Sequence, residues 1–277
     1  MKIKNLVLSG GGVKGICYLG IIKYLEEKNI IKDIKNIVTS SVGAIFGLFI
    51  ALGYTYLEQK TLLDEIKITK LFNLYNININ HFTNKFGLDN GKKIDKFINL
   101  LISKKFGKSD ITFLDLYKKS SINLIITGSC LNKQELVYFN YKDTPNMPLQ
   151  IALRITYSLP FVFDKVTYEE NIYVDGGLLN NFPIDYFKKN IKETIGITLT
   201  GKKILNDLHN LDNYIMALIY APSYSFHNKL LSKYKENICI IDSDIDILDI
   251  NLNKEEISIL INKGYNCIDK FLSHIIL

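Results

Sequence analysis

Residues 35–44 read Lys-Asn-Ile-Val-Thr-Ser-Ser-Val-Gly-Ala, a short apolar strand that runs into Ser41 and then into a long apolar helix. A serine at a sharp turn from strand to helix holds its hydroxyl clear of the backbone. The helix that begins there points its unpaired N–H groups and the positive end of its dipole at the same place. Gly43 is the small neighbour that such a tight turn needs. The pattern indicates a nucleophile at Ser41, although Ser-x-Gly alone is common in loops and helix caps.

A second glycine-rich turn follows the first predicted strand, residues 3–9. Residues 10–15 read Gly-Gly-Gly-Val-Lys-Gly and lead into a predicted helix that ends at about Lys28. Consecutive glycines let backbone N–H groups approach a small anion, and a helix N-terminus adds to the field. The loop is therefore a candidate oxyanion hole, and a glycine turn that only packs strand against helix is the alternative. In a parallel sheet this loop and Ser41 converge, because they end neighbouring strands.

The same loop matches the dinucleotide pattern G-x-G-x-x-G through Gly10, Gly12 and Gly15. That function requires an acidic residue at the end of the second strand. The nearby Asp33 precedes the second strand, and its carboxylate is expected at the wrong end of the sheet. A phosphate-binding loop of the Walker type needs Ser or Thr after its lysine, and Lys14 is followed by glycine.

A carboxylate ends another predicted strand. A hairpin at residues 169–171 leads into the apolar residues 172–174, which are followed by Asp175, Gly176 and Gly177. An acid in this position is placed like a catalytic side chain at a loop tip. A plain Asp-Gly-Gly turn is the alternative, and the pattern alone favours it.

The composition limits the classes of function. The 277 residues are 47% hydrophobic and 22% charged, which suffices for one substantial core, and we predict a single domain over residues 1–277. The net charge of +6 comes from scattered lysines, with Arg154 the only arginine. This argues against sequence-specific nucleic-acid binding, which favours clustered arginines. A diffuse positive charge favours peripheral contact with an anionic membrane surface.

Scattered cysteines and histidines give no ligand spacing, so we expect neither a metal, nor another cofactor, nor a disulfide framework. The apolar run 6–8 is cut by glycines and is not a signal peptide, and residues 37–53 are too short and too interrupted for a confident membrane span. A cytoplasmic location is the resulting expectation.

The remaining pattern alternates helices and strands. We predict mostly helix over residues 54–106 with a loop at 76–91, a short capped helix at 109–117, and a strand pair at 122–127 and 135–140. We also predict a helix that opens at 144–148 and strands at 195–200 and 237–241. A final helix begins at about Lys254, with a capping box of Asn253 and Glu256.

Four motifs together resemble the patatin-like phospholipase family. They are Ser-Gly-Gly-Gly-Val-Lys-Gly at 9–15, Thr-Ser-Ser-Val-Gly-Ala at 39–44, Tyr-Ser-Leu-Pro-Phe-Val-Phe at 157–163 and Val-Asp-Gly-Gly-Leu-Leu-Asn-Asn-Phe-Pro at 174–183. The resemblance implies a three-layer α/β fold with a mostly parallel central sheet flanked by helices. It also implies an acyl hydrolase of phospholipase A or lysophospholipase type, with a Ser-Asp dyad and no catalytic histidine.

The resemblance assigns roles to individual residues. Ser41 is expected to attack the ester, Asp175 to act as base, and the N–H groups of Gly11 and Gly12 to hold the oxyanion, with Gly10 shaping the turn and Val42 N–H assisting. The expected partner is a phospholipid or another acyl-ester lipid.

Two positions depart from the family pattern. Thr39 replaces the first glycine of the Gly-x-Ser-x-Gly elbow, and Ser9 stands where an acid is frequent. Neither is expected to touch a reacting atom, but Thr39 is expected to crowd the turn or the adjacent helix. A lipid-binding protein with weak or no catalysis therefore stays open as an alternative.

Overall fold

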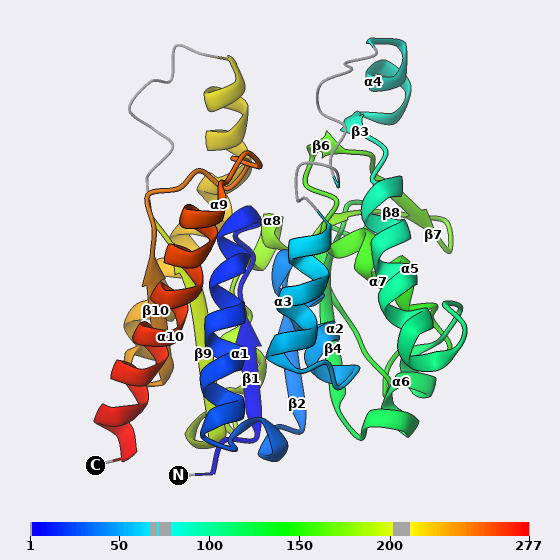
Figure 1. The fold of residues 1–277 in the computed structure, drawn as a ribbon. Helices are drawn as coiled ribbons and strands as arrows, with labels where there is room; N and C mark the ends of the chain where they lie inside the picture. Colours follow the sequence, from blue (N-terminus) through cyan, green and yellow to red (C-terminus); the bar gives the residue numbers. More distant parts are fainter. Residues whose placement is uncertain (1, 67–70, 72–78, 202–210, 277) are drawn as a thin grey trace.

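The computed structural model describes residues 2–66, 71, 79–201 and 211–276. Its centre is an eight-stranded sheet of order β10-β9-β1-β2-β4-β8-β7, with β5 paired to β4. The first five strands of that order are parallel and end at the same edge, drawn uppermost in Figure 1. Their bounds are β10 Ile238–Asp242, β9 Thr194–Thr200, β1 Asn5–Leu8, β2 Asn36–Thr39 and β4 Asn123–Cys130. The antiparallel strands are β5 Glu135–Phe139, β7 Val166–Tyr168 and β8 Asn171–Asp175.

Side chains alternate along the strands and build a core on each face of the sheet. On β1, Leu6 and Leu8 belong to the larger core, whereas Val7 points to the smaller one. The larger core lies under α1 Cys17–Glu27, α2 Val42–Ala51, α5 Lys92–Phe106, α7 Leu149–Thr156 and α10 Lys254–Ile276. The smaller core lies under Phe182–Phe187 and α9 Leu211–Lys233. This is the predicted α/β architecture of three layers.

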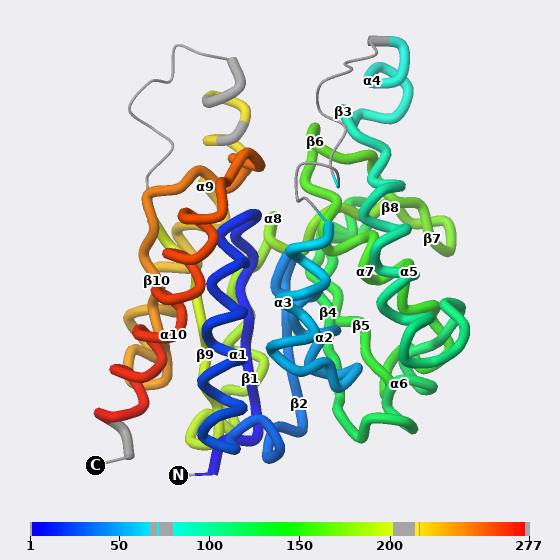
Figure 2. The backbone as a smooth tube through the Cα atoms, viewed as in Figure 1, coloured from blue at the N-terminus to red at the C-terminus, as the bar shows by residue number. Residues whose placement is uncertain are grey.

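The elements beyond the motifs are part of the same sheet and core. β9 pairs with β1, and β10 pairs with β9. The last helix, α10, packs along α1, and Figure 2 shows both chain ends at the same end of the molecule. Asn253 and Glu256 form the predicted capping box, each accepting a backbone N–H of the other.

The position of β8 on β4 decides where Asp175 lies. β5 pairs with Ile126–Cys130 of β4, so β2 and β8 must share the opposite edge of that strand. β2 ends with Thr39 beside Ile126, and the antiparallel β8 ends with Asp175 beside Gly128. The two strands thus run toward each other, and their last residues lie opposite β4 positions about 7 Å apart. This arrangement brings Asp175 to the turn that carries Ser41.

Two predictions for the middle of the chain need correction. The predicted loop at 76–91 contains α4 Ile79–Lys85 and β3 Gly87–Asp89, while residues 76–78 lie outside the described residues. β3 pairs in parallel with β6 Phe161–Phe163 in a separate two-stranded sheet, so a polar sequence is ordered here by long-range pairing. The predicted helix at 109–117 is α6 Phe113–Ser120, because the capping box of Thr112 and Asp115 sets its start.

α3 Tyr56–Glu65 lies in the region predicted as mostly helix, follows α2 and is capped by Thr55 and Glu58. α8 Gly177–Asn180 was not predicted, and it begins at the second glycine after Asp175. None of the helices in the described part of the chain combines the length and apolarity that a membrane crossing requires.

Candidate active site

Ser41 occupies a strained turn between β2 and α2. Its backbone has φ 51° and ψ −128°, a left-handed region that a residue with a side chain rarely adopts. The Ser41 N–H donates to Thr156 Oγ1 at 2.9 Å. Glycine is required two residues later, at Gly43, because a Cβ there would stand 2.4 Å from Leu8 O. These contacts hold the serine at the N-terminus of α2, as the sequence predicted.

The threonine that replaces the first elbow glycine is accommodated by a second glycine. Thr39 is fully buried and donates its hydroxyl to Ile125 O at 3.0 Å on β4. A Cβ at Gly47 of α2 would meet Thr39 Cγ2 at 2.8 Å, so the missing side chain at Gly47 makes the room that Thr39 fills. The expected crowding of the adjacent helix is therefore avoided.

Asp175 is a buried carboxylate bonded to the candidate nucleophile. Its side chain accepts a hydrogen bond from the Ser41 hydroxyl and another from Gly177 N–H at 2.7 Å. Burial raises the pKa of Asp175 to about 7, and both hydrogen bonds oppose that rise. The Asp175 N–H donates to Ser158 O at 2.9 Å, which fixes the end of β8.

The glycine loop is tied down on both sides. Gly10 N–H donates to Asn181 O at 3.1 Å, and Asn181 Nδ2 donates back to Gly10 O at 3.3 Å. Ser9 Oγ accepts Leu199 N–H at 3.0 Å, and buried Lys14 donates to Thr200 O at 3.1 Å, which anchors the loop to β9. Ser9, unlike the acid frequent in the family, thus bonds to the backbone of the neighbouring strand.

Three backbone donors near Ser41 have no acceptor from the protein. Within the described residues, the N–H groups of Gly11, Gly12 and Val42 make no hydrogen bond. Gly12 has φ +56°, and a Cβ there would lie 2.0 Å from Ile247 O, so this position needs glycine. Gly11 is extended, with φ 166°, and a Cβ would press on Leu199. Unpaired donors beside a nucleophile form the arrangement that binds an oxyanion.

One cavity of about 1090 Å³ joins these groups. Gly10, Gly11, Gly12, Ser41, Val42, Asp175 and Gly177 all line it. Apolar side chains line one side, from α2, α5 and β6: Ile45, Phe46, Ile94, Phe97 and Phe163. The other side is formed by α9 and the loop after β10, including Tyr220, Tyr224, Ile245, Ile247 and Leu248.

The remaining predicted residues serve packing around this cavity. A Cβ at Gly15 would meet the Val42 side chain at 2.5 Å, and a Cβ at Gly176 would meet Thr127 Oγ1 at 2.1 Å. Gly177 supplies the N–H to Asp175 and lies close to Asn181 Oδ1. All the predicted site residues are thus brought together, either on the cavity wall or directly behind it.

Sequence reasoning assigned no role to Thr156, Ser158 or Asn181, although all three stand within the four motifs or beside them. Thr156 and Ser158, at the end of α7, hold the backbones of Ser41 and Asp175 respectively. For Thr156 the available signal was a small polar residue in an apolar stretch, because a buried hydroxyl needs a partner. Ser158 acts on Asp175 through its backbone carbonyl, which leaves no signal in the residue type.

The histidines are engaged elsewhere. His227 lines the cavity, but its Nε2 faces Thr198 Oγ1 at 3.5 Å, and burial lowers the pKa of its imidazole. His81 Nε2 bonds Asp164 at 2.8 Å, and His274 Nδ1 contacts Lys270 O. His209 lies outside the described residues, and none of the hydrogen bonds between described residues joins a histidine to Ser41 or Asp175.

Other site chemistries find little support in the described residues. Asp33 lies in a turn before β2, at the opposite edge of the sheet from the glycine loop, where it pairs with Lys2. It is too distant to bind a ribose beside that loop. No group of three or more acidic, histidine or cysteine side chains suited to a metal ion occurs in the part of the chain that is described. All four cysteines are free thiols.

Comparison with known proteins gives the family of the chain. The family described as Patatin-like phospholipase matches residues 6–188, which hold both Ser41 and Asp175. The chain belongs to the patatin-like phospholipase family. Among patatin-like relatives, the uncharacterized protein R571 of Acanthamoeba polyphaga mimivirus is 31% identical, with 95% of this chain and 91% of that protein aligned. The probable lipid hydrolase 463L of Invertebrate iridescent virus 6 is 28% identical over 94% and 89% of the two chains.

A solved structure supports the fold of this patatin-like chain over its whole length. VipD from Legionella pneumophila superposes with a TM-score of 0.72 over 99% of this chain and 67% of its own, at 17% identity. Membership in this family supports a lipid hydrolase.

Proposed function

We propose that this protein is a lipid acyl hydrolase of the phospholipase A or lysophospholipase type, which cleaves carboxylic esters through an acyl-enzyme on Ser41. The observation that carries the proposal is the hydrogen bond from the Ser41 hydroxyl to the buried Asp175 carboxylate in a largely apolar cavity. A nucleophile bonded to a base, with free N–H donors beside it, is the arrangement that acyl transfer needs.

The first half of the reaction uses Asp175 as a general base. The Ser41 oxygen attacks the ester carbonyl carbon while its proton passes to Asp175. The negative charge that develops on the carbonyl oxygen is stabilised by the N–H groups of Gly11, Gly12 and Val42. When the tetrahedral intermediate collapses, the C–O bond to the alcohol breaks, and Asp175 returns the proton to the leaving alkoxide.

The second half repeats these transfers with water. Water gives its proton to Asp175 and adds to the acyl carbon, and the Ser41 oxygen then leaves and takes the proton back. A carboxylate with an ordinary pKa is a poor base for a serine, so the pKa of about 7 at Asp175 suits both of its roles near neutral pH.

The cavity supports a lipid substrate. Its apolar wall can take an acyl chain, because each buried methylene contributes about 0.8 kcal/mol. A lipid in a bilayer reaches this cavity when the protein lies against the membrane surface, so we expect peripheral membrane contact. We also infer that residues 1–277 act as one domain, since cavity residues come from both ends of the chain.

An activity-based probe tests the function directly. A fluorophosphonate should label the wild type and not Ser41→Ala. The same variant should no longer hydrolyse any lipid that the wild type cleaves in a panel of phospholipids, lysophospholipids and acylglycerols. Ser40→Ala is the matched control, since the neighbouring Ser40 hydroxyl is buried and has no hydrogen-bond partner among the described residues. Absence of labelling in a folded wild type would favour the non-catalytic lipid-binding alternative.

A further inference from the structure

Two exposed phenylalanines lie at the small sheet of β3 and β6, one at or just before each strand's first position. Phe86 directly precedes β3 and is 50% exposed, and Phe161 begins β6 and is 43% exposed. Because Gly87 is opposite Phe161 in the parallel pair, the two phenylalanines belong to adjacent strands. In Figure 1 this small sheet rises at the end of the molecule toward which β1 and β2 run.

The backbone at both phenylalanines is unfavourable. Phe86 has φ 61° and Phe161 has φ 66°, a region that suits glycine or asparagine and penalises a bulky side chain. About half of each phenylalanine stays exposed, and the centre of the Phe161 ring lies 6.4 Å from that of Phe82, so burial within the protein uses only part of either side chain. Two phenylalanines that both have an unfavourable backbone conformation indicate a function other than stabilising the fold.

Two lysines lie near Phe86. Lys165 Nζ lies 4.4 Å from the centre of the Phe86 ring, and Lys85 is an exposed neighbour in the chain. Aromatic rings beside lysines are the composition of surfaces that enter the boundary between lipid head groups and acyl chains. We call Lys85, Phe86, Phe161 and Lys165 the aromatic tip.

The aromatic tip is connected directly to the cavity wall. Leu159 and Phe163, on either side of Phe161 in the chain, both line the cavity. Arg154 clamps the base of the tip by donating to Asn90 O at 3.1 Å and Asp164 O at 3.3 Å. A bilayer that receives the aromatic tip would therefore lie next to the cavity that holds Ser41.

We propose that the aromatic tip is a membrane-docking surface, with the two phenylalanines inserted at the level of the lipid head groups and the two lysines against lipid phosphates. This inference rests on the proposed function for its choice of a lipid bilayer over a protein partner. Docking at this point would let a lipid pass from the bilayer into the cavity without crossing bulk water.

Vesicle binding tests the docking surface apart from catalysis. The protein is used as Ser41→Ala, so that no lipid is consumed, with vesicles of phosphatidylcholine alone or mixed with phosphatidylserine. We expect the added change Phe86→Asn with Phe161→Asn to weaken partitioning by about tenfold or more, from the lost burial of two rings. Asparagine tolerates positive φ, so the thermal midpoint should stay equal or rise.

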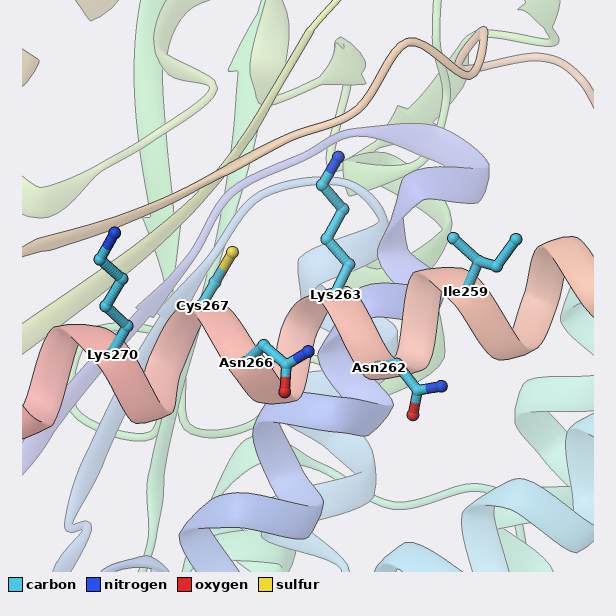
Figure 3. Close-up of a pocket in the computed structure, with 6 residues that line it drawn as sticks. All are labelled: Ile259, Asn262, Lys263, Asn266, Cys267 and Lys270. Atoms are coloured by element: carbon cyan, nitrogen blue, oxygen red, sulfur yellow. The ribbon is translucent and has the colours of Figure 1, made fainter.

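A surface patch on α10 provides the matched control. It contains 55% exposed Ile259 next to Lys263, with Lys270 at the other end of the patch, around a depression of about 480 Å³ (Figure 3). Its residues do not line the active-site cavity. Ile259→Asn removes an exposed apolar side chain near lysines and should leave partitioning unchanged. Lys85→Glu with Lys165→Glu should reduce binding to the anionic vesicles more than to pure phosphatidylcholine.

Failure of the docking surface and failure of the proposed function give different results. In the Ser41-containing protein, the double asparagine variant should hydrolyse a water-soluble short-chain ester at the wild-type rate and vesicle phospholipid at least about tenfold more slowly. Unchanged partitioning of the double variant, or an equal loss from Ile259→Asn, would overturn the docking surface. If the wild type hydrolyses no ester while vesicle binding still depends on the tip, the proposed function fails and the surface stands.

Discussion

Polar side chains have opposite surroundings at the amino ends and at the carboxyl ends of the parallel strands. At the amino ends of the parallel strands, Asn5, Asn36 and Asn123 lie in register and pass a chain of side-chain hydrogen bonds from strand to strand. Asn5 completes it with a bond to Thr194 Oγ1 on β9 at 3.2 Å. At the carboxyl ends, the strained Ser41, the buried Asp175 and the unpaired N–H groups of the glycine loop meet a cavity instead.

The difference shows that one end of the sheet contributes to folding stability, whereas the other end carries the groups that can take part in a reaction. Polar groups that satisfy one another join neighbouring strands, and each such bond contributes about 1 kcal/mol. Polar groups that stay unsatisfied cost stability, but they are ready to bind charge that develops in a reaction. Substitutions at the carboxyl edge should therefore change turnover, and substitutions at the amino edge should change the free energy of unfolding.

Asp175→Asn should cause the largest loss of turnover at the carboxyl edge after Ser41→Ala, about 10²–10⁴-fold, because the amide cannot accept the Ser41 proton. His227→Gln is the control, and it should stay within about tenfold of the wild type if no imidazole acts as base. Steady-state kcat on a soluble ester measures both. A collapse with His227→Gln alone, in a folded protein, would replace the dyad by a triad.

The same carboxylate predicts opposite pH trends for activity and stability. kcat/KM should rise with pH through about 7, because only ionised Asp175 is a base. Its pKa in the folded protein is raised above the unfolded value of 3.8, so the folded state binds more protons between about pH 4 and pH 7. Stability should fall over that window in the wild type more than in Asp175→Asn, as urea unfolding at several pH values would show.

Gly11→Ala should lower kcat by about 10²–10³-fold, the typical loss for one oxyanion donor, with lipid binding changed less. Gly11 is extended, so strain from positive φ is not involved, and the cost arises where the new Cβ presses on Leu199. A matched pair of measurements, kcat and thermal midpoint, separates the two roles. Normal kcat with a lowered midpoint would leave Gly11 as a packing residue only.

Thr156→Val should reduce kcat by about 10-fold to 100-fold with KM little changed, because the Ser41 N–H loses its acceptor and the strained turn loses its support. Thr156→Ser keeps the hydroxyl and should restore most of the rate. Slower labelling by the fluorophosphonate should accompany the loss in the valine variant. Equal rates for valine and serine would show that the hydroxyl does not position Ser41.

Asn36→Ala should have the smallest effect on turnover, within about twofold, since it lies at the far edge of the sheet. It removes the acceptor of Asn123 Nδ2 and the donor to Asn5 Oδ1, while Asn5 keeps its bond to Thr194, and the loss should cost about 1–3 kcal/mol of unfolding free energy. Urea unfolding measures this, with exposed Asn262→Ala on α10 as control. A loss of turnover in Asn36→Ala, at unchanged stability, would contradict the prediction that the amino ends of the strands affect stability only.

Local patterns predicted most of the elements that carry the site. The strands before Gly10 and Ser41 are short apolar runs bounded by glycine and serine, so their type and their parallel arrangement were predictable. The strand predicted to end at Thr127 continues to Cys130, because β5 and β8 pair with its last residues. Pairing between distant strands leaves no trace in local composition, and in this sheet it decides the position of Asp175.

The parts of the site missed by sequence reasoning have the same cause. Thr156 and Ser158 act on Ser41 and Asp175 across sequence distances that no periodicity reveals. β3 lies in the predicted loop at 76–91, since its short Gly-Leu-Asp sequence carries no strand pattern, and its partner β6 was not predicted as a strand. The sequence allowed the candidate nucleophile, base and oxyanion loop to be predicted, but not the contacts that orient them.

The fit between Thr39 and Gly47 limits the order in which this chain can change. Gly47→Ala alone would force a methyl group against Thr39 Cγ2, whereas Thr39→Gly first would open the space for it. The two substitutions are thus not interchangeable steps, since one order passes through a crowded intermediate and the other does not. As long as position 39 carries threonine, position 47 must therefore stay glycine, and it can change only after residue 39 has become smaller.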